Sequence, residues 1–299
     1  MIPDWNVNGV FLANLLRDRH PRLFANLQRI LVAHGIEVRL LADVSDIWGR
    51  DYCPVLVGPR AFVKFRYDPD YLKDDPHLRT GEEVVRSFAD LGDCIVSPIV
   101  LDGGNVVSSR TKAILTDKIY KENRTWKRPE LRLELQRLLQ VEQLIVIPKD
   151  PTDPTDPFGH SDGMVRFINE STVLVNDYTP IDPAFGERLA NIFRRYGLAI
   201  ETIPFSRERR SRDGIPSAVG NYANFLSTEY VVVLPVYGNA RDQTALDKLR
   251  ALFPEVPVVP LDCTELAREG GILNCITANF QRAGKNERGS THWCQSQGR

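Results

Sequence analysis

Several residues that could do chemistry lie in short segments rich in glycine and other turn-forming residues, and the segment 269–277 is the first of these. It places Cys275 four residues after Gly270-Gly271. Glycines allow a sharp turn and the close approach of a ligand. A thiol on such a turn can act as a nucleophile when its pKa falls from about 8.5 and a base lies nearby. The alternative for Cys275 alone is a buried packing role, because free cysteine is among the most buried residue types.

Four further segments of the chain have the same polar, turn-rich character. They are 46–54, 101–105, 159–163 and 219–225. Asp51 and Asp102 each have a plain alternative as turn residues. His160 and Asp162 are two apart, which would put both side chains on one side of a strand, and as a surface pair they need no function. Neither the dinucleotide-binding nor the Walker glycine spacing is present.

A repeating order of predicted elements positions these segments. Apolar residues at helical spacing predict five helices, and a strand is predicted after each. The helices are 21–34, 82–91, 129–139, 183–196 and 243–252, and the strands are 36–41, 94–100, 144–147, 198–203 and 256–260. Five rounds of roughly 40 to 60 residues indicate a stacked or circular α/β architecture. Around a common axis, the five segments would meet in one pocket.

Composition excludes several classes of function. The chain has 299 residues, is 42% hydrophobic and carries a net charge of −1, so it can bury a large core without a basic field for nucleic acid or membranes. The longest apolar run, 230–237, is too short to span a bilayer. The N-terminus has no basic region typical of a signal peptide, so we expect a cytoplasmic protein. Five widely spaced cysteines without C-x-x-C predict neither a disulfide framework nor a zinc ribbon.

We predict a single catalytic domain over 1–281, without a flexible linker. The proline-rich stretch 150–157 is predicted to be an ordered extended loop that leads into Gly159-His160. The arginine-rich stretch 207–212 is expected on a solvated loop, with capture of an anionic substrate group as the alternative. Apolar periodicity stops at 282, so 282–299 is expected to be a poorly packed polar tail.

From 46 to 279 the chain resembles the agmatine deiminase and bacterial-type peptidylarginine deiminase branch of the guanidine-modifying superfamily. Five motifs carry the resemblance, in order: W-x-R-D-x-G-P at 48–54, acidic-G-G-N at 102–105, G-H-x-D-x-x-x-R-F at 159–167, Y-x-N-F at 222–225 and G-G-x-x-H-C-x-T at 270–277. It implies the pentein fold, a five-bladed α/β propeller with pseudo-fivefold symmetry and an axial active site. Cys53 stands where the family usually has glycine, and Asn274 where it often has histidine.

The resemblance also implies roles for individual residues. A guanidinium is a planar cation with five donors, which two carboxylates can clamp, and we assign Asp51 and Asp162 to this clamp. The remaining expected roles are Cys275 as nucleophile, His160 as general acid and then base, Asp102 as the acid that supports the histidine and contacts the substrate, Trp48 as a stacking partner of the guanidinium or its alkyl arm, Asn224 as the residue that orients the thiol or a substrate nitrogen, and Arg50 as a substrate contact.

The expected function is therefore hydrolysis of a guanidino compound, such as agmatine, arginine or a peptidyl-arginine, to a ureido product and ammonia through a cysteine-thiouronium intermediate. We expect no metal or organic cofactor, no nucleic-acid partner and no membrane partner, and we leave a homodimer open. An amidinotransferase with the same intermediate and a non-catalytic protein that binds arginine-like ligands are the alternatives. A cysteine protease fits less well, because no oxyanion-hole signature is present.

Overall fold

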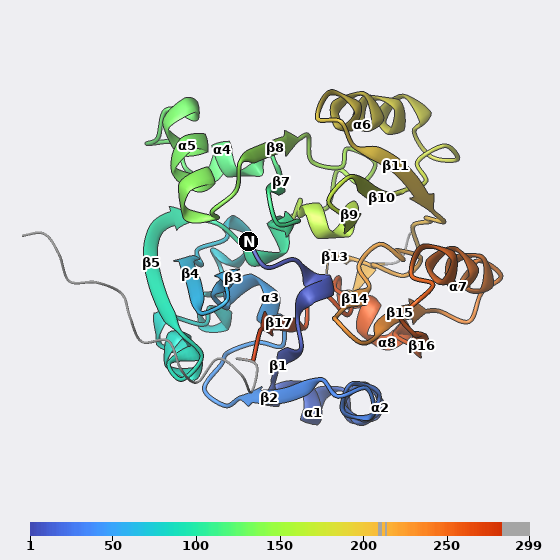
Figure 1. The fold of residues 1–299 in the computed structure, drawn as a ribbon, viewed down its shortest axis with the longest axis horizontal. Helices are drawn as coiled ribbons and strands as arrows, with labels where there is room; N and C mark the ends of the chain where they lie inside the picture. The colour runs from blue at the N-terminus through green and yellow to red at the C-terminus, as the bar shows by residue number, and fades with distance from the viewer. Residues whose placement is uncertain (209–210, 213, 283–299) are drawn as a thin grey trace, which may run out of the picture.

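Five three-stranded sheets surround a central axis in the computed structural model, which describes residues 1–208, 211–212 and 214–282 (Figure 1). In each sheet the central strand pairs antiparallel with one neighbour and parallel with the other. The fold is the predicted five-bladed α/β propeller.

The blades are built from strands of two to eight residues. In ring order the sheets are β17 (Thr277–Phe280), β1 (Gly9–Ala13) and β2 (Glu37–Leu41); β3 (Val55–Gly58), β4 (Ala61–Arg66) and β5 (Asp93–Val100); β6 (Val107–Ser108), β7 (Lys112–Thr116) and β8 (Gln143–Ile147); β9 (Val165–Asn169), β10 (Thr172–Asn176) and β11 (Ala199–Ile203); and β14 (Leu226–Ser227), β15 (Val232–Val236) and β16 (Val258–Asp262). A separate hairpin joins β12 (Ser211–Arg212) to β13 (Ile215–Pro216).

Helices connect the two parallel strands of each blade and lie on the outside of the ring (Figure 1). Four of these crossovers contain a long α-helix: α2 (Pro21–Ala33), α5 (Arg128–Leu138), α6 (Pro183–Arg195) and α7 (Arg241–Leu252). Each turns an apolar stripe inward, and in α2 this stripe places Leu23, Leu27 and Leu31 in the core.

The second blade departs from the prediction. Its crossover, predicted as a helix over 82–91, is the 3₁₀ helix η4 (Glu82–Phe88). Val84 and Phe88 of η4 are buried, so the segment still packs against the core of its blade. The other short helices are α1 (Asn14–Arg19), α3 (Gly49–Tyr52), α4 (Lys118–Glu122), α8 (Thr264–Ala267), η1 (Asp4–Asn6), η2 (Asp70–Leu72), η3 (Pro76–Leu78), η5 (Gly103–Asn105) and η6 (Ser161–Gly163).

The two ends of the described chain close the ring. β17 pairs antiparallel with β1, with Gly9 opposite Phe280 and Leu12 opposite Thr277. All five residues of β1 are buried, so this strand lacks the polar alternation that marks a half-exposed strand. Apart from Arg282, the predicted polar tail lies outside the described residues. Within those residues, no helix combines the length and apolarity that crossing a membrane requires.

Candidate active site

The five turn-rich segments meet at the axis, as predicted, and four of them line one cavity of about 750 Å³, while 101–105 lies behind it. Each segment follows the outermost parallel strand of one blade and leads into the next sheet around the ring. Six of the eight predicted site residues line this cavity: Trp48, Asp51, His160, Asp162, Asn224 and Cys275. Asp102 lies directly behind His160, and Arg50 points elsewhere.

A ring of hydrogen bonds joins each of these segments to the next. The bonds run from Gly104 N to Asp51 Oδ1 (2.9 Å), from Ser161 N to Asn105 Oδ1 (3.3 Å), from Asn221 Nδ2 to the Gly163 carbonyl (2.8 Å), from Asn274 N to Asn224 Oδ1 (3.1 Å) and from Arg50 N to the Cys275 carbonyl (3.0 Å). Because every segment is tied to both neighbours, the side chains of the cavity are held in fixed relation before any ligand binds.

Two glycines allow the close contacts in this ring. A Cβ atom on Gly104 would lie 2.6 Å from Asp51 Oδ1 and 2.7 Å from His160 Nδ1. A Cβ atom on Gly271 would lie 2.3 Å from the Trp48 ring. Real Cβ atoms do not approach other atoms so closely, so these positions require glycine for space.

His160 lies between two carboxylates. Its Nε2 is 2.9 Å from Asp102 Oδ2, and its Nδ1 is 3.5 Å from Asp51 Oδ1. Burial opposes the charged imidazolium, but the two carboxylates outweigh it and raise the pKa of His160 to about 9. We predicted a strand at His160. Instead, His160 directly precedes η6, because the chain turns at Ser161. The side chains of His160 and Asp162 nevertheless both reach the cavity.

The two carboxylates beside His160 differ in their protonation. Burial, together with the charges of Asp102 and Asp162, outweighs the opposing effect of His160 and raises the pKa of Asp51 to about 7. Burial would also raise the pKa of Asp102, but Lys118 and His160 outweigh it and lower that pKa to about 2. Asp102 is therefore a permanent carboxylate, whereas Asp51 titrates near neutral pH.

Cys275 is a thiol in the ligand-free cavity. Its Sγ–H donates to Asn224 Oδ1 at 3.4 Å, and Sγ is 3.9 Å from Asp162 Oδ2. Burial, followed by the charges of Asp162 and Asp51, raises the pKa of Cys275 well above its usual range. A cation bound between these carboxylates would oppose the effect of their charges and favour the thiolate.

Two predicted substrate contacts have different surroundings. Trp48 lines the cavity and packs against Gly271. Arg50 does not line it, because its guanidinium donates to the Asn274 carbonyl at 3.2 Å and to Asn279 Oδ1 at 3.1 Å.

The loop residue Arg207 does line the cavity. Its guanidinium is held by Asp150 at 2.6 Å and by Asp153 at 3.2 Å. The predicted ordered loop 150–157 provides both partners, and it is held in turns by Asp150, Asp153 and Asp156, whose carboxylates accept backbone N–H bonds two residues on.

Sequence reasoning missed several residues around the site. Asn274 Nδ2 donates to Asp162 Oδ2 at 2.6 Å and so fixes a carboxylate beside the thiol. Tyr71 and Phe158 pack near the His160 ring, with ring centroids 6.5 and 6.2 Å from it. The position of Asn274, directly before Cys275, was the one available signal. Tyr71 lies in η2, after β4 and outside the five segments.

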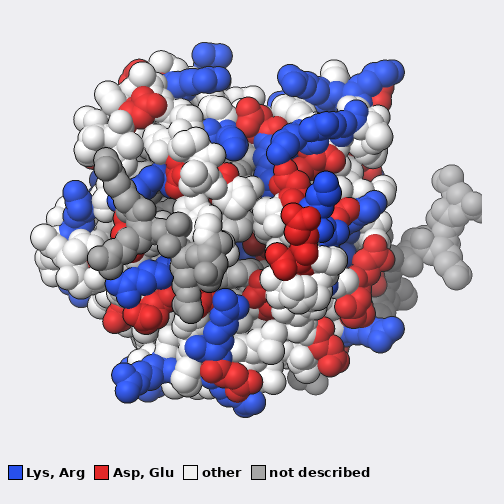
Figure 2. Space-filling view, turned by 180° about the vertical axis from the view of Figure 1, so that it is seen from behind, with Lys and Arg blue, Asp and Glu red and all other residues white. Residues whose placement is uncertain are grey.

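Acidic side chains dominate the lining of the cavity. They are Asp46, Asp51, Asp70, Asp74, Asp75, Asp150, Asp156, Asp162 and Glu269, against the two basic residues Arg19 and Arg207 and the histidine His160. Figure 2 shows Asp and Glu side chains gathered on one face of the molecule beside a band of Lys and Arg side chains. A cavity with this excess of carboxylates favours a cationic ligand.

The ring fold and the axial cysteine, histidine and carboxylates define a guanidine-modifying enzyme. The model of the Porphyromonas-type peptidyl-arginine deiminase family matches residues 13–280, so the chain belongs to this family. The family consists of hydrolases that act on C–N bonds of linear amidines.

Related proteins and structures agree with this assignment. A protein from Shewanella sp. (strain W3-18-1), provisionally named an agmatine deiminase, is 30% identical over 317 residues, which cover 89% of this chain and 81% of that protein. The structure of a provisionally named arginine deiminase from Porphyromonas gingivalis superposes with a TM-score of 0.77 at 19% identity and covers 94% of this chain and 98% of its own. Agmatine deiminase of Enterococcus faecalis gives a TM-score of 0.75 at 16% identity, with 94% and 95% covered. At these identities the two structures establish the fold.

Proposed function

We propose that this protein is a deiminase that hydrolyses a small guanidino compound with a cationic far end, such as agmatine, to a ureido product and ammonia. The observation that carries the proposal is the meeting of Cys275, His160 and the two clamp carboxylates, Asp51 and Asp162, in one acidic cavity. These residues supply a nucleophile, a proton donor and counter-charges for a guanidinium.

Substrate binding begins with the carboxylates. A guanidinium offers N–H donors in a planar fork, and Asp51 and Asp162 offer acceptors in the same cavity as Cys275. The ligand's positive charge offsets the two negative charges that keep the thiol protonated. Binding therefore lowers the pKa of Cys275 and releases its proton to solvent, which forms the nucleophile when a substrate is in place.

The first half-reaction releases ammonia. The thiolate of Cys275 attacks the central guanidinium carbon and forms a C–S bond. The imidazolium of His160 donates its proton to one terminal nitrogen, the C–N bond breaks, and ammonia leaves. Cys275 then carries a cationic thiouronium, and His160 is neutral.

The second half-reaction uses water. Neutral His160 takes a proton from a water molecule, and the oxygen adds to the thiouronium carbon. The C–S bond breaks as the added hydroxyl loses its proton, which yields the ureido product and returns Cys275 to the thiol. His160 is again an imidazolium, which is the form that its raised pKa favours.

The charge of the cavity supports an amine rather than a carboxylate at the far end of the substrate. Nine carboxylic acids line it, and Arg207, which could receive a carboxylate, is already bonded to Asp150 and Asp153. Agmatine carries an ammonium where arginine carries an additional carboxylate, so the excess of acids favours agmatine over arginine.

A comparison of substrates tests the proposal. Ammonia release is measured with agmatine, arginine and an arginine-containing peptide, and Cys275→Ser serves as the inactive control. We expect the highest kcat/KM with agmatine, and we expect Cys275→Ser to bind agmatine in isothermal titration without turning it over. Preference for arginine or the peptide would overturn the substrate assignment. Turnover by Cys275→Ser near the wild-type rate would overturn the covalent mechanism.

A further inference from the structure

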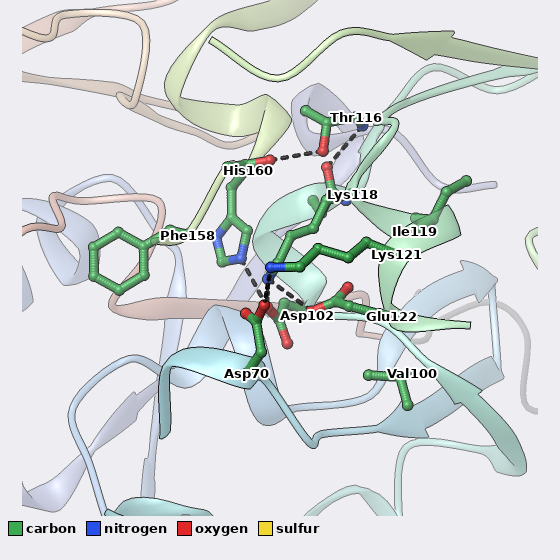
Figure 3. A network of polar contacts seen from close by, with 12 residues as sticks. Asp70, Val100, Asp102, Thr116, Lys118, Ile119, Lys121, Glu122, Phe158 and His160 are labelled. Atoms are coloured by element: carbon green, nitrogen blue, oxygen red, sulfur yellow. Dashed lines mark hydrogen bonds and ion pairs between the residues drawn. The ribbon is translucent and has the colours of Figure 1, made fainter. Parts of the chain in front are cut away.

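Lys118 lies behind the carboxylate that contacts the histidine (Figure 3). Its Nζ is 2.8 Å from Asp102 Oδ2, the same oxygen that lies 2.9 Å from His160 Nε2. The Lys118 side chain is only 5% exposed and does not line the cavity. Lys118 therefore does not contact a substrate in the cavity, and it can act on the reaction only through Asp102 and through its charge on His160.

The backbone around Lys118 is fixed to the active-site segments. Lys118 is the first residue of α4, directly after β7. The last residue of β7, Thr116, donates its N–H to Asn105 Oδ1 at 2.9 Å and its hydroxyl to the Gly159 carbonyl at 2.6 Å. The start of α4 is thus tied to two of the five segments, which places the lysine reproducibly behind Asp102.

The Lys118 ammonium has two other neighbours. Glu122, one turn further along α4, places Oε1 2.9 Å from Nζ, and the Tyr71 ring centroid is 5.1 Å away. The nearby Asp70 is paired with Lys121 at 2.5 Å. Asp102 and Glu122 therefore share the buried ammonium of Lys118. Because all three side chains are buried, their charges interact strongly.

We propose that Lys118 is a positioning residue for the deiminase reaction: it holds Asp102 as a carboxylate and, through it, fixes the His160 ring with Nδ1 as the nitrogen that exchanges the proton. The inference rests on the proposed function, because it gives Lys118 a part in the same proton transfer. It adds a residue that lies outside the cavity and outside the five turn-rich segments.

Removing the ammonium would change the histidine in a defined direction. His160 faces Asp51 and Asp102, which raise its pKa, and Lys118, which lowers it. Without Lys118 the pKa of His160 rises further above 9, and its imidazolium becomes a weaker acid for the departing nitrogen. The His160 ring would also be held by an Asp102 carboxylate that has lost Lys118, its second charged partner. The clamp carboxylates keep their positions, so substrate binding should change little.

The test compares Lys118→Met with Lys127→Met. Lys127 also pairs with a glutamate, at 3.2 Å from Glu130, but its side chain is 82% exposed and lies on the surface. We expect Lys118→Met to lower kcat by about tenfold or more, within the range that acid–base groups contribute, and to leave KM within about twofold of wild type. The high-pH limb of kcat assigned to His160 should move to higher pH. Lys127→Met should match wild type in all three.

A direct measurement on His160 separates the inference from the proposed function. NMR titration of the His160 ring, assigned by comparison with His160→Asn, needs no turnover. We expect its pKa to rise in Lys118→Met. We expect it to fall in Glu122→Gln, because loss of the competing carboxylate leaves more of the Lys118 charge to act on Asp102 and His160. Glu122→Gln also decides the matter if Lys118→Met does not fold.

Either of two results would overturn the inference. One is an unchanged His160 titration in the folded variants, which would give Lys118 a purely structural role. The other is a raised KM with an unchanged kcat in Lys118→Met, which would give it a role in substrate binding. A wild-type protein that releases no ammonia from any guanidino compound would instead overturn the proposed function, and the NMR titration would still report on Lys118.

Discussion

Cys275 and Asp51 show how burial sets the chemistry of single residues here. Burial and nearby carboxylates keep the Cys275 thiol protonated, and burial raises the pKa of Asp51 to about 7. Both groups therefore respond to a bound cation, which favours the thiolate and the carboxylate together. As a thiol, Cys275 is a poor nucleophile. The positive charge of the proposed substrate would favour its thiolate, which is the reactive form.

The clamp predicts a loss of both affinity and turnover when one charge is removed. Asp51→Asn and Asp162→Asn should each weaken agmatine binding by about 1.5–3 kcal/mol, the contribution of a hydrogen bond to a charged group. Isothermal titration measures this loss. Asp247→Asn, which alters a surface carboxylate bonded to Gln243 on α7, is the control. Wild-type affinity in both clamp variants would place the clamp elsewhere.

The pKa shifts predict a pH dependence with two limbs. Asp51 must be ionised to bind the guanidinium, so kcat/KM should fall as pH drops through about 7. His160 must be protonated to release ammonia, so kcat, measured at saturating agmatine where the Cys275 thiolate has already formed, should fall as pH rises through about 9. Initial rates at low and at saturating agmatine across pH 5–11 measure the two limbs. A rate that stays constant below pH 6 would contradict the role of Asp51.

The sequence predicted most of the side chains that meet in the cavity, but it could not predict the groups that pack behind them. Cys275, His160 and the aspartates lie in motifs that local patterns reveal. The contact of Lys118 with Asp102 could be recognised only from the fold, because α4 brings the lysine against this carboxylate. Arg50 was expected at the substrate because of its motif, but its guanidinium bonds to Asn274 and Asn279 outside the cavity.

At the scale of elements, short 3₁₀ turns carry the site. Asp102 and His160 directly precede η5 and η6, and Gly104 within η5 lets Asp51 and His160 approach each other. A regular helix or strand would not offer this closeness, because each side chain would need more space. The prediction of a strand at His160 was wrong, because three residues are too few to distinguish a polar turn from the alternation of a strand.

Gly104→Ala tests the importance of this close approach. The new Cβ would lie 2.6 Å from Asp51 Oδ1 and 2.7 Å from His160 Nδ1, so both side chains must move. We expect kcat/KM to fall about 100-fold, the scale of loss for a misplacement of about 1 Å. Gly49→Ala is the matched control, since its Cβ would have only ordinary contacts from 3.7 Å. Equal activity of the two variants would show that the contact at Gly104 is tolerated.

At the scale of the whole molecule, the repeating order of elements predicted a stacked or circular architecture, and the family resemblance predicted the five-bladed ring. Helix, strand and turn recur five times, and each round places its polar segment at the same end of a blade. The closing strand β1 was not predicted, because its residues are buried throughout and its partner β17 is distant in sequence. Pairings between the chain ends leave no local pattern.

The closure of the ring predicts a stability effect at Gly9. A Cβ atom there would lie 2.2 Å from the Phe280 ring, so Gly9→Ala should destabilise the protein by about 1–3 kcal/mol, the usual cost of overpacking a core. Urea unfolding measures the change. Adding Phe280→Leu to Gly9→Ala should recover part of the loss by making room. A single variant as stable as wild type would contradict tight closure at this pair.

The central claim is that Cys275 forms a covalent bond to the amidine carbon and that water then hydrolyses this intermediate. The most direct measurement is mass spectrometry of the product formed from agmatine in heavy-oxygen water, in a buffer free of amines. The account predicts ammonia release and a ureido product that contains one oxygen from the solvent. A product that forms only when an amine is supplied, without solvent oxygen, would contradict it and establish transfer in place of hydrolysis.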